Sequence, residues 1–190
     1  MTSRRHWTAG LLVGLTLVAS GCTGSPTPGP TPSASPSPTR LGTSAPPVAR
    51  LWDASAYRTK PCGLFTDDQA RVLGYNKPGS ASTDDPDVAT CIRDTGTASG
   101  GFMVKYYFAT DLLGKIYRRE ILFPGINSAS PITVEGQPAL KPTIPGAEFC
   151  TVAVGLTNTQ GFEVRIDDKA VDPCDRAVTI AETIMRNLGA

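Results

Sequence analysis

The chain has 190 residues, with 18 basic side chains against 17 acidic ones and a single histidine. Such a balanced charge indicates neither nucleic acid nor an anionic membrane surface as a partner. The one histidine, His6, lies in a segment that we expect to be removed. The mature chain would then lack the base of Ser–His and Cys–His nucleophiles and the commonest zinc ligand.

Residues 1–21 have the pattern of a secretory signal peptide. A basic start at Arg4, Arg5 and His6 is followed by an apolar run over residues 8–18 and by three small residues. The apolar run is shorter than the roughly 20 residues that a membrane-spanning helix needs. A permanent transmembrane helix is therefore the less favoured alternative.

The next residue, Cys22, is the predicted lipidation site. Ala19-Ser20-Gly21-Cys22 is similar to the bacterial lipobox, in which the cysteine receives a diacylglyceryl group and becomes the new amino terminus. The alternative is an ordinary signal peptide with an incidental cysteine. Two acyl chains anchor a protein stably, so we expect a lipid-anchored protein on the extracytoplasmic face of the cell membrane.

Residues 22–50 are predicted to form a tether between this cysteine and a globular domain. The segment contains eight of the seventeen prolines together with Ser, Thr and Gly, and it contains no acidic residue. Such a composition cannot bury enough apolar surface to fold, and its prolines favour an extended chain. Recognition of this segment by a proline-binding module and O-glycosylation are alternatives that the sequence leaves open.

The predicted globular domain, residues 51–190, begins with a short helix. Thr66 and Gln69 have the spacing of a capping box, and Gly74 is a natural end for the helix. The acidic pair Asp67 and Asp68 suits the positive end of the helix dipole. We therefore favour a structural role for this pair over a catalytic one.

Two strands follow, over residues 88–94 and 102–108, joined by a connection that contains Gly96, Gly100 and Gly101. Apolar residues recur at every second position of the second strand, at Phe102, Val104, Tyr106 and Phe108, and for its aromatic residues a core position is favoured over a ligand cleft. A second helix begins at Thr110 or Asp111 and is expected to expose the pair Arg118-Arg119. Four more strands are predicted over residues 132–134, 137–140, 150–156 and 162–166.

The last helix begins at Asp172 and Pro173, which suit the N-cap and the first turn, and it has an apolar face with helical spacing. Neighbouring strands with helices packed on them are typical of an α+β fold. We predict an antiparallel sheet of five to six strands with three helices packed on it.

Acylation of Cys22 would leave four of the five cysteines, an even number that can form two disulfides. Three pairings are open. We favour Cys62–Cys91 and Cys150–Cys174, because each bond would tie a helical segment to the strand beside it.

Several segments together resemble an actinobacterial lipoprotein family called domain of unknown function 3558. They are residues 61–66 (PCGLFT), the strand cysteine Cys91, residues 134–139 (VEGQPA), residues 150–154 (CTVAV) and Cys174 at the start of the last helix. The resemblance implies a cell-envelope lipoprotein and no catalytic residues. One departure is Ile92-Arg93, where the family often has an aromatic residue.

The remaining candidates for chemistry are carboxylates. The segment from Asp84 to Asp87 could hold calcium, but it lacks the spacing of an EF-hand loop, so a solvated loop is favoured. Asp167-Asp168 is interpreted as a turn. We expect no enzyme activity, no metal and no cofactor. The leading hypothesis is a ligand-binding or sensing module with a concave apolar pocket, and the alternative is an accessory protein that docks on a membrane or cell-wall protein.

Overall fold

The computed structural model describes residues 41–96, 100–142, 144, 146–168 and 172–189. The predicted signal peptide, Cys22 and the tether before residue 41 lie outside these residues. One compact unit, Pro36–Ala190, contains every element described below.

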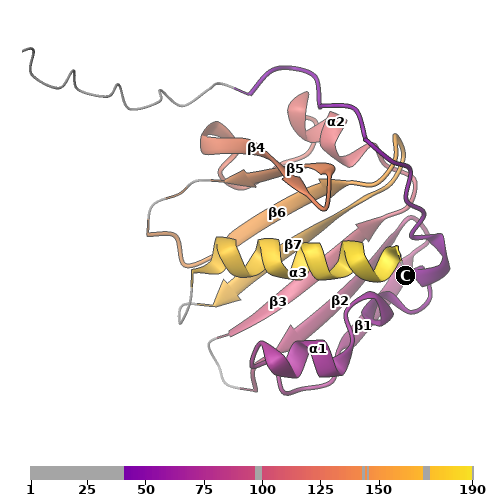
Figure 1. The fold of residues 1–190 in the computed structure, drawn as a ribbon, viewed down its shortest axis with the longest axis vertical. Coiled ribbons are helices and arrows are strands. Elements are labelled where there is room, and N and C mark those ends of the chain that lie inside the picture. The colour runs from indigo at the N-terminus through magenta and orange to yellow at the C-terminus, as the bar shows by residue number, and fades with distance from the viewer. Residues whose placement is uncertain (1–40, 97–99, 143, 145, 169–171, 190) are drawn as a thin grey trace, which may run out of the picture. The chain divides into compact units, whose positions relative to one another are not determined.

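The domain is built on a seven-stranded antiparallel sheet with the spatial order β1-β2-β3-β7-β6-β5-β4 (Figure 1). The two long strands β3 and β7 pair at its centre. The strands are β1 (Ser80–Asp85), β2 (Val88–Asp94), β3 (Gly100–Tyr107), β4 (Ala129–Val134), β5 (Gln137–Pro142), β6 (Cys150–Gly155) and β7 (Gly161–Asp168).

Three α-helices and three short 3₁₀ turns accompany the sheet within the described residues. Figure 1 shows α3 lying across one face of the central strands, with α1 and α2 at opposite ends of the sheet. Their bounds are α1 (Asp67–Val72), α2 (Leu112–Tyr117) and α3 (Pro173–Leu188), with 3₁₀ turns η1 (Ser55–Tyr57), η2 (Pro61–Leu64) and η3 (Ile126–Ser128).

The α+β fold is confirmed, but the strand count of five to six was wrong by one edge strand. All six side chains of β1 are exposed, so this strand has no apolar alternation that a sequence pattern could detect. A second correction concerns Asp167-Asp168, which belongs to the end of β7 and not to a turn. The strand reaches this point through its pairing with β3, in which Asp168 lies opposite Gly100, and the buried Asp168 lies 3.5 Å from Arg176 of α3.

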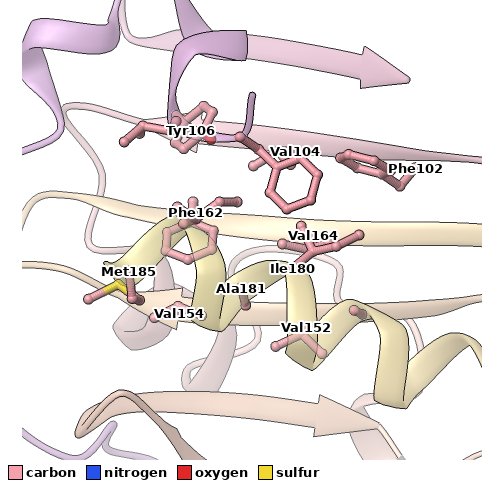
Figure 2. Packing of buried hydrophobic residues seen from close by; sticks show 14 of the residues in the cluster. Phe102, Val104, Tyr106, Val152, Val154, Phe162, Val164, Ile180, Ala181 and Met185 are labelled. Atoms are coloured by element: carbon pink, nitrogen blue, oxygen red, sulfur yellow. The ribbon is translucent and has the colours of Figure 1, made fainter. Parts of the chain in front are cut away.

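The main core lies between α3 and one face of the sheet. Figure 2 shows side chains of β3, β7 and β6 pointing toward the buried face of the helix, which presents Ile180, Ala181 and Met185. Phe102 on β3 also makes an edge-on contact with Tyr75, with ring centroids 4.7 Å apart. The strand aromatics are therefore core residues, as predicted.

A second, smaller core lies on the opposite face of the sheet, under α2. Leu112, Leu113 and Ile116 of the helix pack there against Leu140 and Ala153, which alternate along their strands with residues of the main core. Gly155 and Gly161 allow the close approach, because a Cβ atom at either position would lie 2.9 Å from a leucine of α2.

The described part of the predicted tether, residues 41–50, contacts the domain. Leu41 and Ala45 pack against the second core, and Gln137 Nε2 donates a hydrogen bond to the carbonyl of Arg50 at 2.7 Å. In Figure 1 this segment passes α2 and continues toward η1. The folded unit thus includes residues on the amino-terminal side of position 51.

Both disulfides are present with the pairing that we favoured. Cys62–Cys91 joins η2 to β2, and Cys150–Cys174 joins β6 to the first turn of α3, each with a Cα–Cα distance of 5.0 Å. Each bond therefore fastens a helical segment to one strand of the sheet.

Candidate functional site

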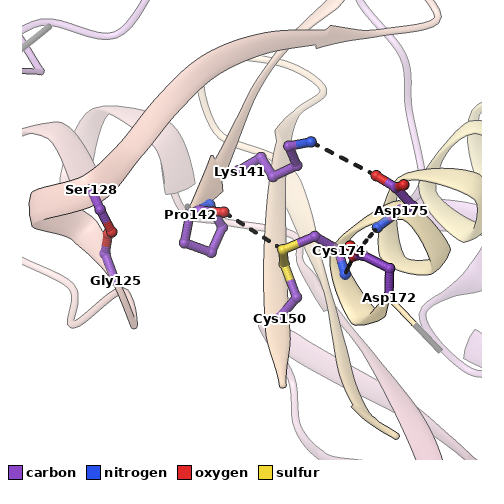
Figure 3. Close-up of a disulfide and its surroundings, with 8 residues drawn as sticks. All are labelled: Gly125, Ser128, Lys141, Pro142, Cys150, Asp172, Cys174 and Asp175. Carbon is purple, nitrogen blue, oxygen red and sulfur yellow. Dashed lines mark hydrogen bonds and ion pairs between the residues drawn. A yellow bond between two sulfur atoms is a disulfide. The ribbon is translucent and has the colours of Figure 1, made fainter. Parts of the chain in front are cut away.

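A surface pocket of about 350 Å³ lies at the amino-terminal end of α3, beside the Cys150–Cys174 disulfide. Figure 3 shows the disulfide together with the polar residues around it. The described residues that line the pocket come from the end of β5, the segment before β6 and the start of α3: Lys141, Pro142, Ile144, Gly146, Ala147, Phe149, Asp172, Pro173, Cys174 and Asp175.

The helix end is already capped from within the chain. Asp172 accepts hydrogen bonds from the amides of Cys174 at 2.9 Å and Asp175 at 3.2 Å. Lys141 Nζ lies 3.9 Å from the carboxylate of Asp175 across the pocket rim. The free amides that often make a helix start an anion site are therefore occupied here, and the charges at the rim include both signs.

The pocket wall itself is largely apolar. Ile144 keeps 37 % of its surface exposed, and Phe149 is half-buried. The guanidinium of Arg165 lies 4.9 Å from the centre of the Phe149 ring, and it is held there by a two-pronged pair with Asp167 at 2.8 Å. An apolar wall with a few charges at the rim is the usual composition of a small-molecule site.

Two other hollows lie near the entry of the chain into the domain. A polar one of about 270 Å³ lies between residues 43–48 and α2. A second, of about 440 Å³, is lined mainly by prolines of the entry segment and the β4–β5 hairpin. The pocket beside the disulfide differs from both because it combines an apolar wall with charges of both signs.

The sheet face that carries α2 is only half-buried over β2, β3 and β7, and we call this region the half-exposed sheet face. Its cross-strand rows place Ile92 beside Met103 and Arg165, and Lys105 beside Glu163. Ile92 keeps 43 % of its surface exposed, and the other four are intermediate. This region therefore presents apolar and charged groups side by side.

Glu163 is a carboxylate of that face whose pKa is shifted by its surroundings. Burial raises its pKa, while a hydrogen bond from the Tyr107 hydroxyl at 3.0 Å and the cations of Lys105 and Arg165 oppose the rise. Burial and the neighbouring carboxylate raise the pKa of Tyr107 as well. The neutral Tyr107 phenol thus donates a hydrogen bond to the Glu163 carboxylate, whose pKa is raised.

Arg93 is a buried residue whose role the sequence analysis missed. Only 1 % of it is exposed, and its guanidinium contacts the Asp67 carboxylate and the carbonyls of Cys62 and Phe65. This hydrogen bond to Arg93 holds the pKa of Asp67 below its ordinary value. The signal in the sequence for the burial of Arg93 was the alternation along β2, because Ala89, Cys91 and Arg93 lie on the same face of the strand.

The other acidic residues singled out in the sequence have structural partners. Thr66 and Gln69 form the predicted capping box, and Asp68 pairs with Arg71 at 2.7 Å. In the turn between β1 and β2, the amide of Asp87 donates to Asp85 at 2.8 Å. The described residues contain no group of three or more side chains that could hold a metal ion.

The basic pair Arg118-Arg119 is exposed as predicted, but it follows α2 instead of lying on it. Arg118 is the C-cap residue and pairs with Glu120 at 2.6 Å and with Asp111 at 3.4 Å. Arg119 adopts a left-handed backbone with φ of 64°. These residues therefore belong to a tight loop.

The fold defines a two-disulfide α+β domain in which α3 packs on one face of the central strands and the other face is half-exposed over β2, β3 and β7. The chain belongs to the family described as "Protein of unknown function (DUF3558)", whose model matches residues 17–187. The resemblance seen in the sequence is thereby confirmed. No curated protein and no solved structure matches the chain. Within the described residues, no helix is long and apolar enough to cross a membrane.

Proposed function

We propose that this protein is a lipid-anchored lipoprotein of the extracytoplasmic face of the cell membrane, with a non-enzymatic ligand-binding or sensing domain. The main support is the use of its cysteines. Two disulfides take up four of the five thiols and leave Cys22, the residue that follows the signal-like segment. Structural disulfides persist in oxidising compartments outside the cytoplasm.

The pocket beside the Cys150–Cys174 disulfide is the proposed ligand site. Its volume of about 350 Å³ lies within the range of small-molecule sites. Ile144, Phe149 and Pro173 would contact an apolar body, and Lys141 and Asp175 would contact a polar end. We infer a small amphiphilic molecule as its ligand.

A non-enzymatic role agrees with the partners of the acidic residues. Asp67 is paired with Arg93, Asp168 lies beside Arg176, and Asp172 caps α3. Each of these carboxylates stabilises the fold. The mature chain would also lack histidine, the commonest general base.

Mass spectrometry of the full-length protein, isolated from membranes in mild detergent, tests both parts of the proposal. We expect a diacylated Cys22 at the amino terminus and a co-purified small molecule. In an Ile144→Asp variant the molecule should be lost, whereas the control Ile92→Asp, which changes a similarly exposed isoleucine elsewhere, should retain it. An unprocessed amino terminus would contradict the proposed lipid anchor. Equal recovery of the molecule from both variants would contradict the proposed ligand site.

The half-exposed sheet face supports a second candidate function, docking of an envelope protein. Ile92 and Met103 lie side by side there between charged residues, as in the mixed surfaces of transient interfaces. A photoreactive residue at position 92 should then trap one specific protein in intact cells. The same residue at Val72, which is exposed on α1, is the control. An identical crosslinking pattern at both positions would count against docking.

A further inference from the structure

The loop after α2 presents a leucine to solvent. Leu122 keeps 92 % of its surface exposed, more than any other large apolar side chain among the described residues. Its neighbour Phe123 is buried in the second core, and Ile121 packs partly against that core. The chain is therefore anchored on both sides of a leucine that points away from the protein.

Hydrogen bonds and ion pairs fix this loop. The amide of Glu120 donates to the carbonyl of Lys115 at 2.8 Å, and Arg118 Nε bonds the Glu120 carboxylate at 2.6 Å. Arg119 holds a positive φ, which is uncommon for a residue other than glycine, and bonds the side chain of Asn127 at 3.1 Å. The exposure of the leucine follows from this bracing.

Three basic residues precede the leucine in the chain. Lys115 lies in the last turn of α2, and Arg118 and Arg119 follow it, while Arg118 is paired with the carboxylates of Asp111 and Glu120. We call Lys115, Arg118, Arg119 and Leu122 the α2 surface. An exposed apolar side chain among cations is the composition that binds at an anionic lipid–water interface.

The chain enters the domain at this same end. Leu41, the first described residue, packs against the second core, as Ile121 does. Leu41 lies nineteen positions after Cys22, and a chain of this length in an extended conformation would reach about 60 Å, at about 3.1 Å per residue. A lipid on Cys22 would therefore hold the entry point, at the α2 end, within about 60 Å of the bilayer, whereas α1 lies at the other end of the sheet (Figure 1).

We propose that the α2 surface docks on anionic phospholipid headgroups, with Leu122 inserted among them. This inference rests on the proposed anchoring through Cys22. A few cations and one leucine bind weakly on their own, but a tether raises the local concentration of lipid to about the millimolar range. Docking would orient α1 and the edge strand β1 away from the membrane.

The test uses residues 22–190, which contain every described helix, strand and disulfide. In the oxidised protein Cys22 is the one free thiol, so it can be coupled to maleimide lipid in vesicles. Hydrogen exchange of the amides of residues 119–123 is compared on phosphatidylcholine alone and with roughly one third phosphatidylglycerol. We expect about fivefold slower exchange on the anionic vesicles, and no slowing in about 1 M salt.

A matched pair of variants decides the result. Leu122→Asp should remove the protection, while Val72→Asp, at an equally apolar position on α1 that is 85 % exposed, should retain it. Equal exchange on both lipids, or protection that survives Leu122→Asp, would overturn the proposal. The lipid in this test is attached chemically, so a failure of docking does not depend on whether the protein is acylated in the cell. Native acylation is tested separately by the mass spectrometry described above.

Discussion

Replacement of the buried Arg93 by methionine should destabilise the domain without changing its surface. The methionine keeps most of the apolar stem and removes the guanidinium. Two carbonyl groups, of Cys62 and Phe65, then lose their donor. Asp67 loses its ion-pair partner as well, but its side chain is 52 % exposed and water can replace that partner.

The size of the effect follows from the two carbonyls. A buried acceptor left without a partner costs about 1–3 kcal/mol. The bond to Phe65 is buried and the bond to Cys62 is partly buried, so the sum should be about 2–4 kcal/mol. Removal of the buried charge also removes its desolvation cost, which offsets part of this loss, since Arg93 Nε has no hydrogen-bond partner among the described residues. The loss remains a large share of a typical stability of about 5–15 kcal/mol.

Urea unfolding of the oxidised protein measures this loss as a shift of the midpoint at constant slope. The control is Arg71→Met, which breaks an exposed pair with Asp68 and should change stability by less than about 0.5 kcal/mol. If the Arg93→Met midpoint coincided with that of the control, the buried guanidinium would not stabilise this corner of the fold.

Three further outcomes are expected. Burial raises the pKa of Glu163 in the folded protein above its value in the unfolded chain. The free energy of unfolding should therefore fall as the pH rises from the unfolded pKa through the folded pKa. Glu163→Gln should flatten this fall in urea midpoints measured from about pH 4 to 8. Removing the Cys150–Cys174 bond by a double alanine variant opens a 24-residue separation and should cost about 3–4 kcal/mol in the same assay. Phe162→Ala removes a fully buried ring and should cost about 3–5 kcal/mol, whereas a loss below 1 kcal/mol would place this ring outside the core.

Local signals in the sequence predicted most of the fold. The capping box at Thr66, the N-cap at Asp172 and the alternation of β3 each depend on residues a few positions apart. Such features need no knowledge of the rest of the chain. The disulfide pairing was favoured on the same elements, because each bond was expected to tie a helical segment to a strand that packs beside it.

Features that depend on tertiary contacts could not be predicted in this way. β1 forms part of the sheet through its pairing with β2, and its exposed polar side chains have no pattern of their own. The partners of Arg93 lie 26 to 31 residues away in the chain. Asp168 was interpreted as a turn residue because a charged side chain at the end of a strand is usually exposed. Its buried position is explained by Arg176, which becomes its neighbour only when α3 packs on the sheet.

The candidate pocket and the half-exposed sheet face meet at one side chain. Phe149 lines the pocket, and its ring carries the guanidinium of Arg165, which belongs to the sheet face. A ligand that displaced this ring would remove the apolar support of Arg165, which would keep its pair with Asp167. Occupancy of the pocket would then change the charge arrangement that a docking partner contacts. The two proposed functions are therefore physically linked, and Phe149→Ala should weaken both the recovery of the small molecule and the crosslink at position 92.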